Sequence, residues 1–71
     1  MAEKRVTLSD CRKKLGTQKF VASQIGISTV YLRMIENGTF TPGRDLMFKL
    51  ERFFNKPVED LFPDYFQNDK V

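Results

Sequence analysis

The sequence contains no histidine and no tryptophan, and only one of its 71 residues is a cysteine. A single cysteine cannot form an internal disulfide, and without histidine or a second thiol a structural zinc site has no ligand set. A glycine-rich phosphate loop and a nucleophile–base pair are also absent, so we expect no enzyme, cofactor or small-molecule ligand. Cys11 is therefore interpreted as an inert core thiol.

Long hydrophobic runs are missing as well. No apolar stretch approaches the roughly 20 residues of a membrane span, and the N-terminus lacks the apolar segment of a signal peptide. We expect a cytoplasmic protein without membrane contact. We assign residues 1–66 to one domain and 67–71 to a short polar tail. A chain of this length buries only about 60% of its unfolded surface, which leaves oligomerisation as a source of further stability.

Charge is distributed unevenly within a net charge of +3. Residues 1–20 hold six basic side chains against two acidic ones, whereas residues 53–71 hold two basic against four acidic ones. The first segment could approach phosphates, which would repel the second. Ordinary solvated helix surfaces explain the same charges.

The spacing of apolar residues predicts an all-α fold of five helices without strands. The expected helices span about 8–15, 18–25, 28–36, 44–54 and 58–62. In the first helix, Leu8, Cys11 and Leu15 share one face. We place Pro42 in the first turn of the fourth helix, where its missing N–H is no loss.

The segment 17–38 (TQKFVASQIGISTVYLRMIENG) is the most informative part of the sequence. Thr17 and Ser28 are suited to begin helices, and Gly26 and Gly38 to end them in the left-handed conformation. Two short helices joined by a tight glycine turn have the layout of a helix-turn-helix. A plain helical hairpin is the alternative, and the small Ala22 at the expected helix crossing favours the helix-turn-helix.

The second helix of this segment has an outward face that remains after the core is packed. Leu32 and Ile35 face inward at helical spacing. The opposite surface consists of Val30, Arg33 and Met34, with Thr29 and Tyr31 on its flanks.

These residues resemble the helix-turn-helix of the Cro and phage-repressor type, also called XRE-type regulators. The resemblance rests on Thr17-Gln18, Ala22, Ile25-Gly26, Ser28, Ile35 and Glu36-Asn37-Gly38, and it extends through Pro42 to Asp60-Leu61-Phe62. It covers about 55 of the 71 residues. It is specific because small residues, helix caps and apolar positions agree together. It implies a compact repressor-like domain that places helix 28–36 in the major groove of DNA.

The resemblance also implies roles for individual residues. Base-reading positions are Ser28, Thr29, Val30 and Met34, with Arg33 on the same face. Phosphate contacts are implied at Thr17, Gln18, Tyr31 and Asn37, and Lys19, Thr39, Thr41 and Arg44 are further candidates. An ion pair is implied between Arg12 and Glu36. Because Val30 and Met34 can only pack on thymine methyl groups, Arg33 to guanine would be the main polar contact with a base.

We therefore expect a sequence-specific regulator of double-stranded DNA, in the form of a small repressor or Cro-like switch. We expect a bacterial or phage protein associated with the nucleoid, acting as a homodimer on a palindromic operator. The C-terminal aromatics either fold back on the domain or meet a second subunit; the predicted dimer contacts are Phe62, Tyr65 and Phe66. The rival hypothesis is an anti-repressor-like or antitoxin-like module that binds a protein through the apolar face of helix 28–36 or the aromatic C-terminus.

Overall fold

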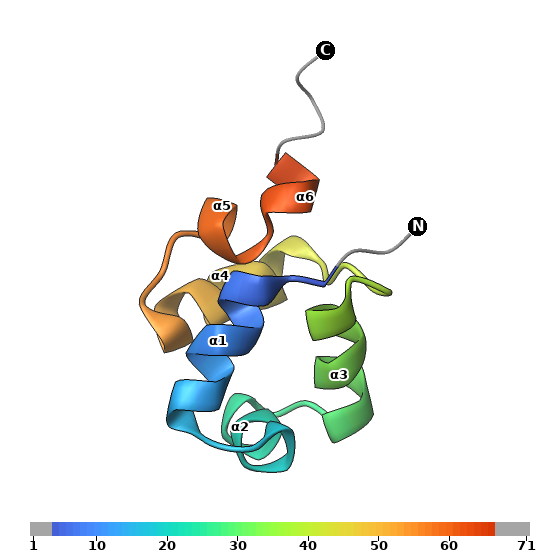
Figure 1. The fold of residues 1–71 in the computed structure, drawn as a ribbon, viewed down its shortest axis with the longest axis vertical. Coiled ribbons are helices and arrows are strands. Elements are labelled where there is room, and N and C mark those ends of the chain that lie inside the picture. Colours follow the sequence, from blue (N-terminus) through green and yellow to red (C-terminus); the bar gives the residue numbers. More distant parts are fainter. Residues whose placement is uncertain (1–3, 67–71) are drawn as a thin grey trace.

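The computed structural model describes residues 4–66, except for the side chain of Phe66. Within this range the chain forms six helices and no strand, which confirms the all-α class but corrects the helix number from five. Figure 1 shows α2 at one end of the molecule and α6 at the other. The helices are α1 (Val6–Leu15), α2 (Gln18–Ile25), α3 (Thr29–Asn37), α4 (Arg44–Phe54), α5 (Val58–Leu61) and α6 (Pro63–Phe66).

The caps of the helix-turn-helix are confirmed. The Thr17 hydroxyl accepts a hydrogen bond from the Phe20 N–H at 3.1 Å, and the Ser28 hydroxyl accepts one from the Tyr31 N–H at 3.0 Å. Gly26 and Gly38 end α2 and α3 with φ of 95° and 80°, a region where a Cβ is unfavourable. Residues within segment 17–38 thus determine where α2 and α3 begin and end.

The core lies between α1, α2, α3, α4 and α5. Cys11 packs against it and is only partly buried. Leu15 was expected there but is 49% exposed, because it ends α1 at the rim of a shallow surface hollow. The buried apolar residues are Leu8, Val21, Ala22, Ile25, Leu32, Ile35, Met47, Leu50, Phe54, Val58, Leu61 and Phe62.

The start of α1 and the place of Pro42 differ from the prediction for local reasons. α1 begins at Val6 rather than at Leu8, because the Arg5 carbonyl already accepts the Ser9 N–H at 3.0 Å. Pro42 is buried and lies before Gly43, the N-cap of α4, so it is outside the first turn. The additional helix α6 begins directly at Pro63, a residue suited to a first helical position.

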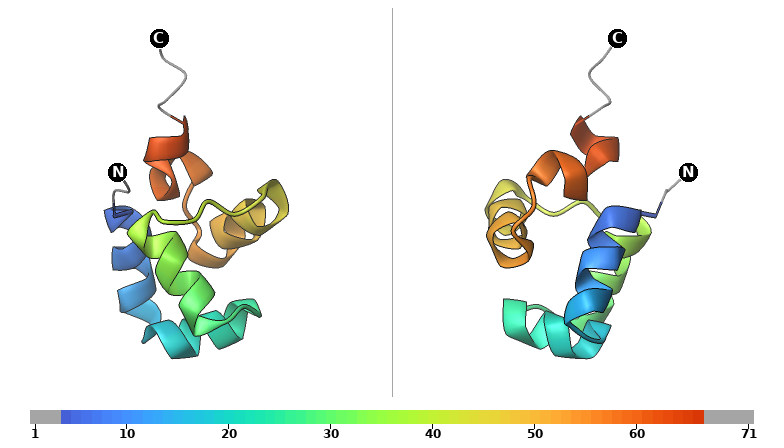
Figure 2. Two further views of the ribbon diagram at one scale, coloured as in Figure 1. Left: turned by 90° about the vertical axis from the view of Figure 1, so that its right-hand side faces the viewer. Right: turned by 60° about the vertical axis from the view of Figure 1, so that its left-hand side comes forward.

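The start of α1 lies beside the end of α3. The Arg5 N–H donates to the Glu36 carbonyl at 2.8 Å. Both views of Figure 2 show this approach of the chain's beginning to the segment that follows α3. The contact brings the N-terminal segment next to the predicted DNA-contacting region.

Candidate nucleic-acid interface

The outward face of α3 is presented to solvent as the helical spacing predicted. Val30 is 55% exposed, Arg33 is exposed, and Met34 is partly buried. On the inner side Leu32 and Ile35 are fully buried. The opposite burial of these two faces means that α3 is fixed by its inner side while its outer side stays accessible.

The structure brings together Arg12, Glu36 and Gln18 beneath α3. Arg12 donates from Nε to Oε2 of Glu36 at 2.8 Å and from Nη2 to Oε1 at 3.0 Å. The Gln18 amide donates to Oε1 of Glu36 at 3.2 Å. Glu36 is 4% exposed, and its carboxylate raises the pKa of Arg12 through these hydrogen bonds. This network joins α1, α2 and α3 through one buried carboxylate.

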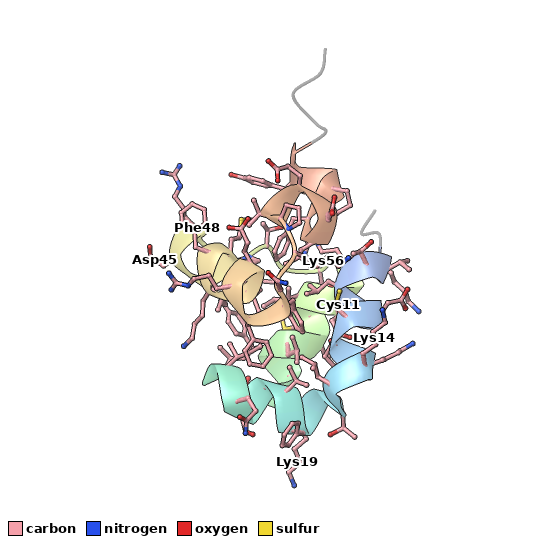
Figure 3. All side chains as sticks on the ribbon, turned by 90° about the vertical axis from the view of Figure 1, so that its left-hand side faces the viewer. Cys11, Lys14, Lys19, Asp45, Phe48 and Lys56 are labelled. Carbon is pink, nitrogen blue, oxygen red and sulfur yellow. The ribbon has the colours of Figure 1, made fainter. Side chains whose placement is uncertain are left out.

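The start of α2 combines backbone N–H groups that precede the first intrahelical hydrogen bond with a nearby cation. The first N–H groups of a helix have no partner within the helix and favour an anion. Lys19 is exposed, and Figure 3 shows its side chain extending away from the body of the protein. Gln18 has a further amide hydrogen besides the one given to Glu36. The chemistry of this end of α2 suits a phosphate.

The turn after α3 carries the other predicted phosphate contacts. Asn37 and Thr39 are exposed. The N–H groups of Thr39 and Phe40 both donate to the Met34 carbonyl, at 3.0 and 3.3 Å. The Tyr31 ring packs on Phe40 with centroids 5.1 Å apart. These contacts fold the turn back onto α3.

Two further predicted contacts lie beside this turn. The Thr41 hydroxyl oxygen accepts a hydrogen bond from Arg5 at 2.8 Å. Arg44 is exposed at the first position of α4. The hydroxyl of Thr41 keeps its own hydrogen as a donor, so the bond from Arg5 leaves it able to meet a phosphate.

The sequence interpretation missed Arg5. Its side chain is 1% exposed, although it was counted among the basic residues that could attract phosphates. It donates from Nε and Nη2 to the two carboxylate oxygens of Asp64, at 3.0 and 2.9 Å. It also donates from Nη1 to the carbonyls of Ile35 and Phe40, at 2.8 and 2.9 Å. No periodic pattern links residues so far apart in the chain.

Of the predicted dimer contacts, Phe62 does not lie on the surface. Phe62 is fully buried, with the guanidinium of Arg5 at 4.8 Å from its ring centroid, so it belongs to the core of one chain. Tyr65 is 54% exposed. The side chain of Phe66 and the tail 67–71 lie outside the described residues. Of the predicted contact residues, Tyr65 is the one that the structure places on the surface.

Residues 4–66 contain neither a candidate metal site nor a candidate membrane-spanning helix. No group of three or more potential metal-ligating side chains lies together in that range. None of the helices described there has the length and hydrophobicity needed to cross a bilayer.

Known proteins resemble this chain over most of its length. A family model described as helix-turn-helix matches residues 8–61. Two Archaeoglobus fulgidus proteins, each named an uncharacterized HTH-type transcriptional regulator, are 34% and 30% identical over 59 residues; these alignments cover 82% of this chain and 84% and 83% of the relatives. A Methanocaldococcus jannaschii protein of the same description is 37% identical over 46 residues, which is 65% of this chain and 70% of the relative. No solved structure matches significantly.

The chain therefore belongs to the helix-turn-helix family of the Cro and phage-repressor (XRE) type. This family consists of DNA-binding regulators and is not enzymatic. The three relatives are archaeal, so the expected bacterial or phage source has no support.

Proposed function

We propose that this protein is a transcriptional regulator that recognises a specific double-stranded DNA sequence by placing α3 in the major groove. The supporting observation is the arrangement of α3. Its inner side is fixed by Leu32, Ile35 and the buried Glu36 network, and its outer side exposes Val30 and Arg33. A helix that must present side chains to base edges needs this combination of a fixed backbone and an accessible face.

The proposed contacts divide into two kinds. Arg33 reads guanine, whereas Val30 and Met34 pack on thymine methyl groups, with Ser28 and Thr29 at the helix start. The phosphate contacts position the protein without reading sequence; they are Thr17, Gln18, Lys19, Tyr31, Asn37, Thr39, Thr41 and Arg44.

Selection of bound duplexes from a random library, followed by affinity measurements at several salt concentrations, tests this proposal. Arg33→Ala should cost about 1–3 kcal/mol on the selected site and flatten preference at one base pair. Lys19→Ala should weaken all duplexes alike and reduce the salt slope by about one unit. Lys56→Ala is the matched control, because Lys56 is an exposed lysine between α4 and α5. Equal losses on selected and random DNA for Arg33→Ala would exclude base reading by Arg33.

We further propose a homodimer that binds a palindromic operator as a compact repressor or Cro-like switch. One short recognition helix reads few base pairs, and two-fold dimers solve this by pairing half-sites. Phe48 is 47% exposed, and with Tyr65 it lines a groove of about 390 Å³ between the start of α4 and α6. Figure 3 shows Phe48 on the outer side of α4. Sedimentation of the intact protein and of Tyr65→Ser, free and with the selected duplex, tests this surface.

The protein-interaction hypothesis is supported by one feature, the exposed apolar Val30 on the outer face of α3. A module of that kind would show no affinity for any duplex at low salt. DNA binding with a steep salt dependence would decide for the regulator.

A further inference from the structure

The buried Arg5 forms a network that the DNA-binding proposal does not use. Its guanidinium makes five hydrogen bonds to four other residues, and no buried polar side-chain atom of the described residues lacks a partner. The four partners are Ile35 in the last turn of α3, Phe40 and Thr41 in the turn after it, and Asp64 in α6. Arg5 thus joins the N-terminal segment to two segments far from it in the sequence, residues 35–41 and α6.

We propose that Arg5 is a positioning residue for the turn 38–42 and that its partner Asp64 makes DNA binding depend on α6. This inference rests on the proposed function, because that turn carries the proposed phosphate contacts at Thr39 and Thr41. Arg5 itself is buried and does not meet DNA.

The contacts of Arg5 define how the turn is held. A single nitrogen, Nη1, donates to both Ile35 and Phe40, at 2.8 and 2.9 Å, so the end of α3 and the turn share one anchor. Nη2 donates to the Thr41 hydroxyl at 2.8 Å. The planar guanidinium fixes these directions relative to one another. The path of the turn away from α3 is therefore set by the orientation of one side chain.

Asp64 sets that orientation from the other end of the chain. Its carboxylate accepts the two hydrogen bonds from Nε and Nη2, at 3.0 and 2.9 Å, in the two-pronged geometry that is most directional for arginine. The Phe62 ring lies against the guanidinium, with 4.8 Å from the guanidinium carbon to the ring centroid. Without the carboxylate, Arg5 keeps its contact with the Phe62 ring but loses the partner that orients its Nε and Nη2 donors.

The role of Asp64 can be tested because electrostatics and positioning predict opposite changes in DNA affinity when its charge is removed. Simple electrostatics says that a protein with one negative charge fewer binds the DNA polyanion more tightly. A positioning role says that it binds more weakly. The structure offers a matched carboxylate, Glu51 in α4, whose Oε2 accepts the Val58 N–H at 3.3 Å. Glu51 also ties a C-terminal helix to the domain, but it makes no contact with Arg5.

The experiment compares Asp64→Asn with Glu51→Gln, two substitutions that change the charge equally and preserve side-chain shape. Affinity for the selected duplex is measured against salt. Amide hydrogen exchange of Thr39 and Phe40 is measured without DNA. We expect Asp64→Asn to weaken binding about three- to tenfold with little change in the salt slope, because Thr39 and Thr41 are uncharged and their phosphate contacts release no counterion. We also expect the two amides to exchange faster relative to core amides. Glu51→Gln should show neither change.

The outcomes separate this inference from the proposed function. Asp64→Asn binding the selected duplex as tightly as the parent protein, or more tightly, would overturn the dependence on α6. Unchanged exchange at Thr39 and Phe40 would overturn the positioning of the turn. If the parent protein binds no duplex, the proposed function fails, and the exchange measurement alone still decides whether Arg5 and Asp64 order the turn.

Discussion

Two arginine–carboxylate pairs converge on the last turn of α3, and they differ in where their residues come from. Arg12 and Glu36 both lie inside residues 8–61, the part shared with the helix-turn-helix family. Arg5 and Asp64 lie on either side of that part. The first pair joins α1 to α3, and Gln18 adds α2 through the same carboxylate. The second pair connects the two flanking segments to the turn that follows α3.

The difference shows that segments outside the family region can add contacts to the shared helix-turn-helix while its own ion pair stays in place. The family region fixes the angle of α3 through side chains on α1, α2 and α3. The flanks act on the backbone at the end of α3, through the carbonyls of Ile35 and Glu36. Four experiments test whether the two pairs differ in this way.

The largest effect is expected for Arg5→Ala. The substitution removes the hydrogen bonds that Arg5 gives to Asp64 and to the carbonyls of Ile35 and Phe40, and it opens a space beside Phe62. A hydrogen bond that involves a charged group contributes about 1.5–3 kcal/mol, so losing the hydrogen bonds of Arg5 should cost about 3–5 kcal/mol, a large share of the stability of a small domain. Urea denaturation measures this, with Arg33→Ala on the exposed face of α3 as a control expected to change stability by less than about 0.5 kcal/mol. Equal effects of the two substitutions would show that the Arg5 network adds no stability.

Glu36→Gln should have a somewhat smaller effect, of about 2–3 kcal/mol. The new amide keeps the shape of the side chain but leaves Arg12, which is 11% exposed, without a counter-charge. Denaturation should be compared with Glu59→Gln, an exposed carboxylate of α5. A loss as small as that of the control would mean that packing, and not the ion pair, holds α3 in the family region.

Asp64 allows a pH test. Hydrogen bonds from Arg5 hold the pKa of its carboxyl below the usual value, while burial raises it and the charge of Arg5 lowers it further. A lowered folded-state pKa means that the stabilisation is complete above the unfolded pKa of about 3.9 and is lost as the pH falls through the folded value. Asp64→Asn should therefore melt below the parent protein at neutral pH, with the gap closing as the pH falls below about 4 and through the lowered folded-state pKa of Asp64. Thermal melts across this range measure the gap, and a constant gap would assign the loss to something other than charge.

The smallest effect is the response of the two pairs to salt. The Asp64 side chain is 35% exposed and that of Glu36 is 4% exposed. Salt screens exposed charges more than buried ones. A double-mutant cycle for each pair at low and high salt should show the Arg5–Asp64 coupling falling by about half a kcal/mol or less and the Arg12–Glu36 coupling unchanged. A larger fall in coupling energy for Arg12–Glu36 than for Arg5–Asp64 would show that salt screens the family pair more strongly.

The sequence predicted those features that depend on neighbours along the chain. Thr17 and Ser28 as caps, Gly26 and Gly38 as helix ends, and the buried face of α3 all follow from short-range stereochemistry. The Arg12–Glu36 pair came from the family resemblance, since spacing alone does not bring two separate helices together. Neither short-range stereochemistry nor the family resemblance predicted the role of Arg5. It sits in a basic segment that fits a solvated surface, and its partner is 59 residues away.

The C-terminal segment was misinterpreted for a related reason. An aromatic residue following the last core helix has no local signal that separates a core position from a subunit contact. Phe62 is buried because α5 and the start of α6 bring it beneath the guanidinium of Arg5. The acidic residues nearby suggested a tail repelled by DNA, whereas Asp64 is turned inward to the same guanidinium.

The distance along the chain between Arg5 and Asp64 has a consequence for synthesis. A ribosome extends a chain from its N-terminus, at about 5–20 residues per second. Arg12 and Glu36 both lie before α4, so that pair needs no segment beyond α3. Arg5 must wait until Asp64 has been added and released, so the turn after α3 takes its final path only after α6 has left the ribosome. A nascent chain that ends before Asp64 would contain both partners of the first pair and only one partner of the second.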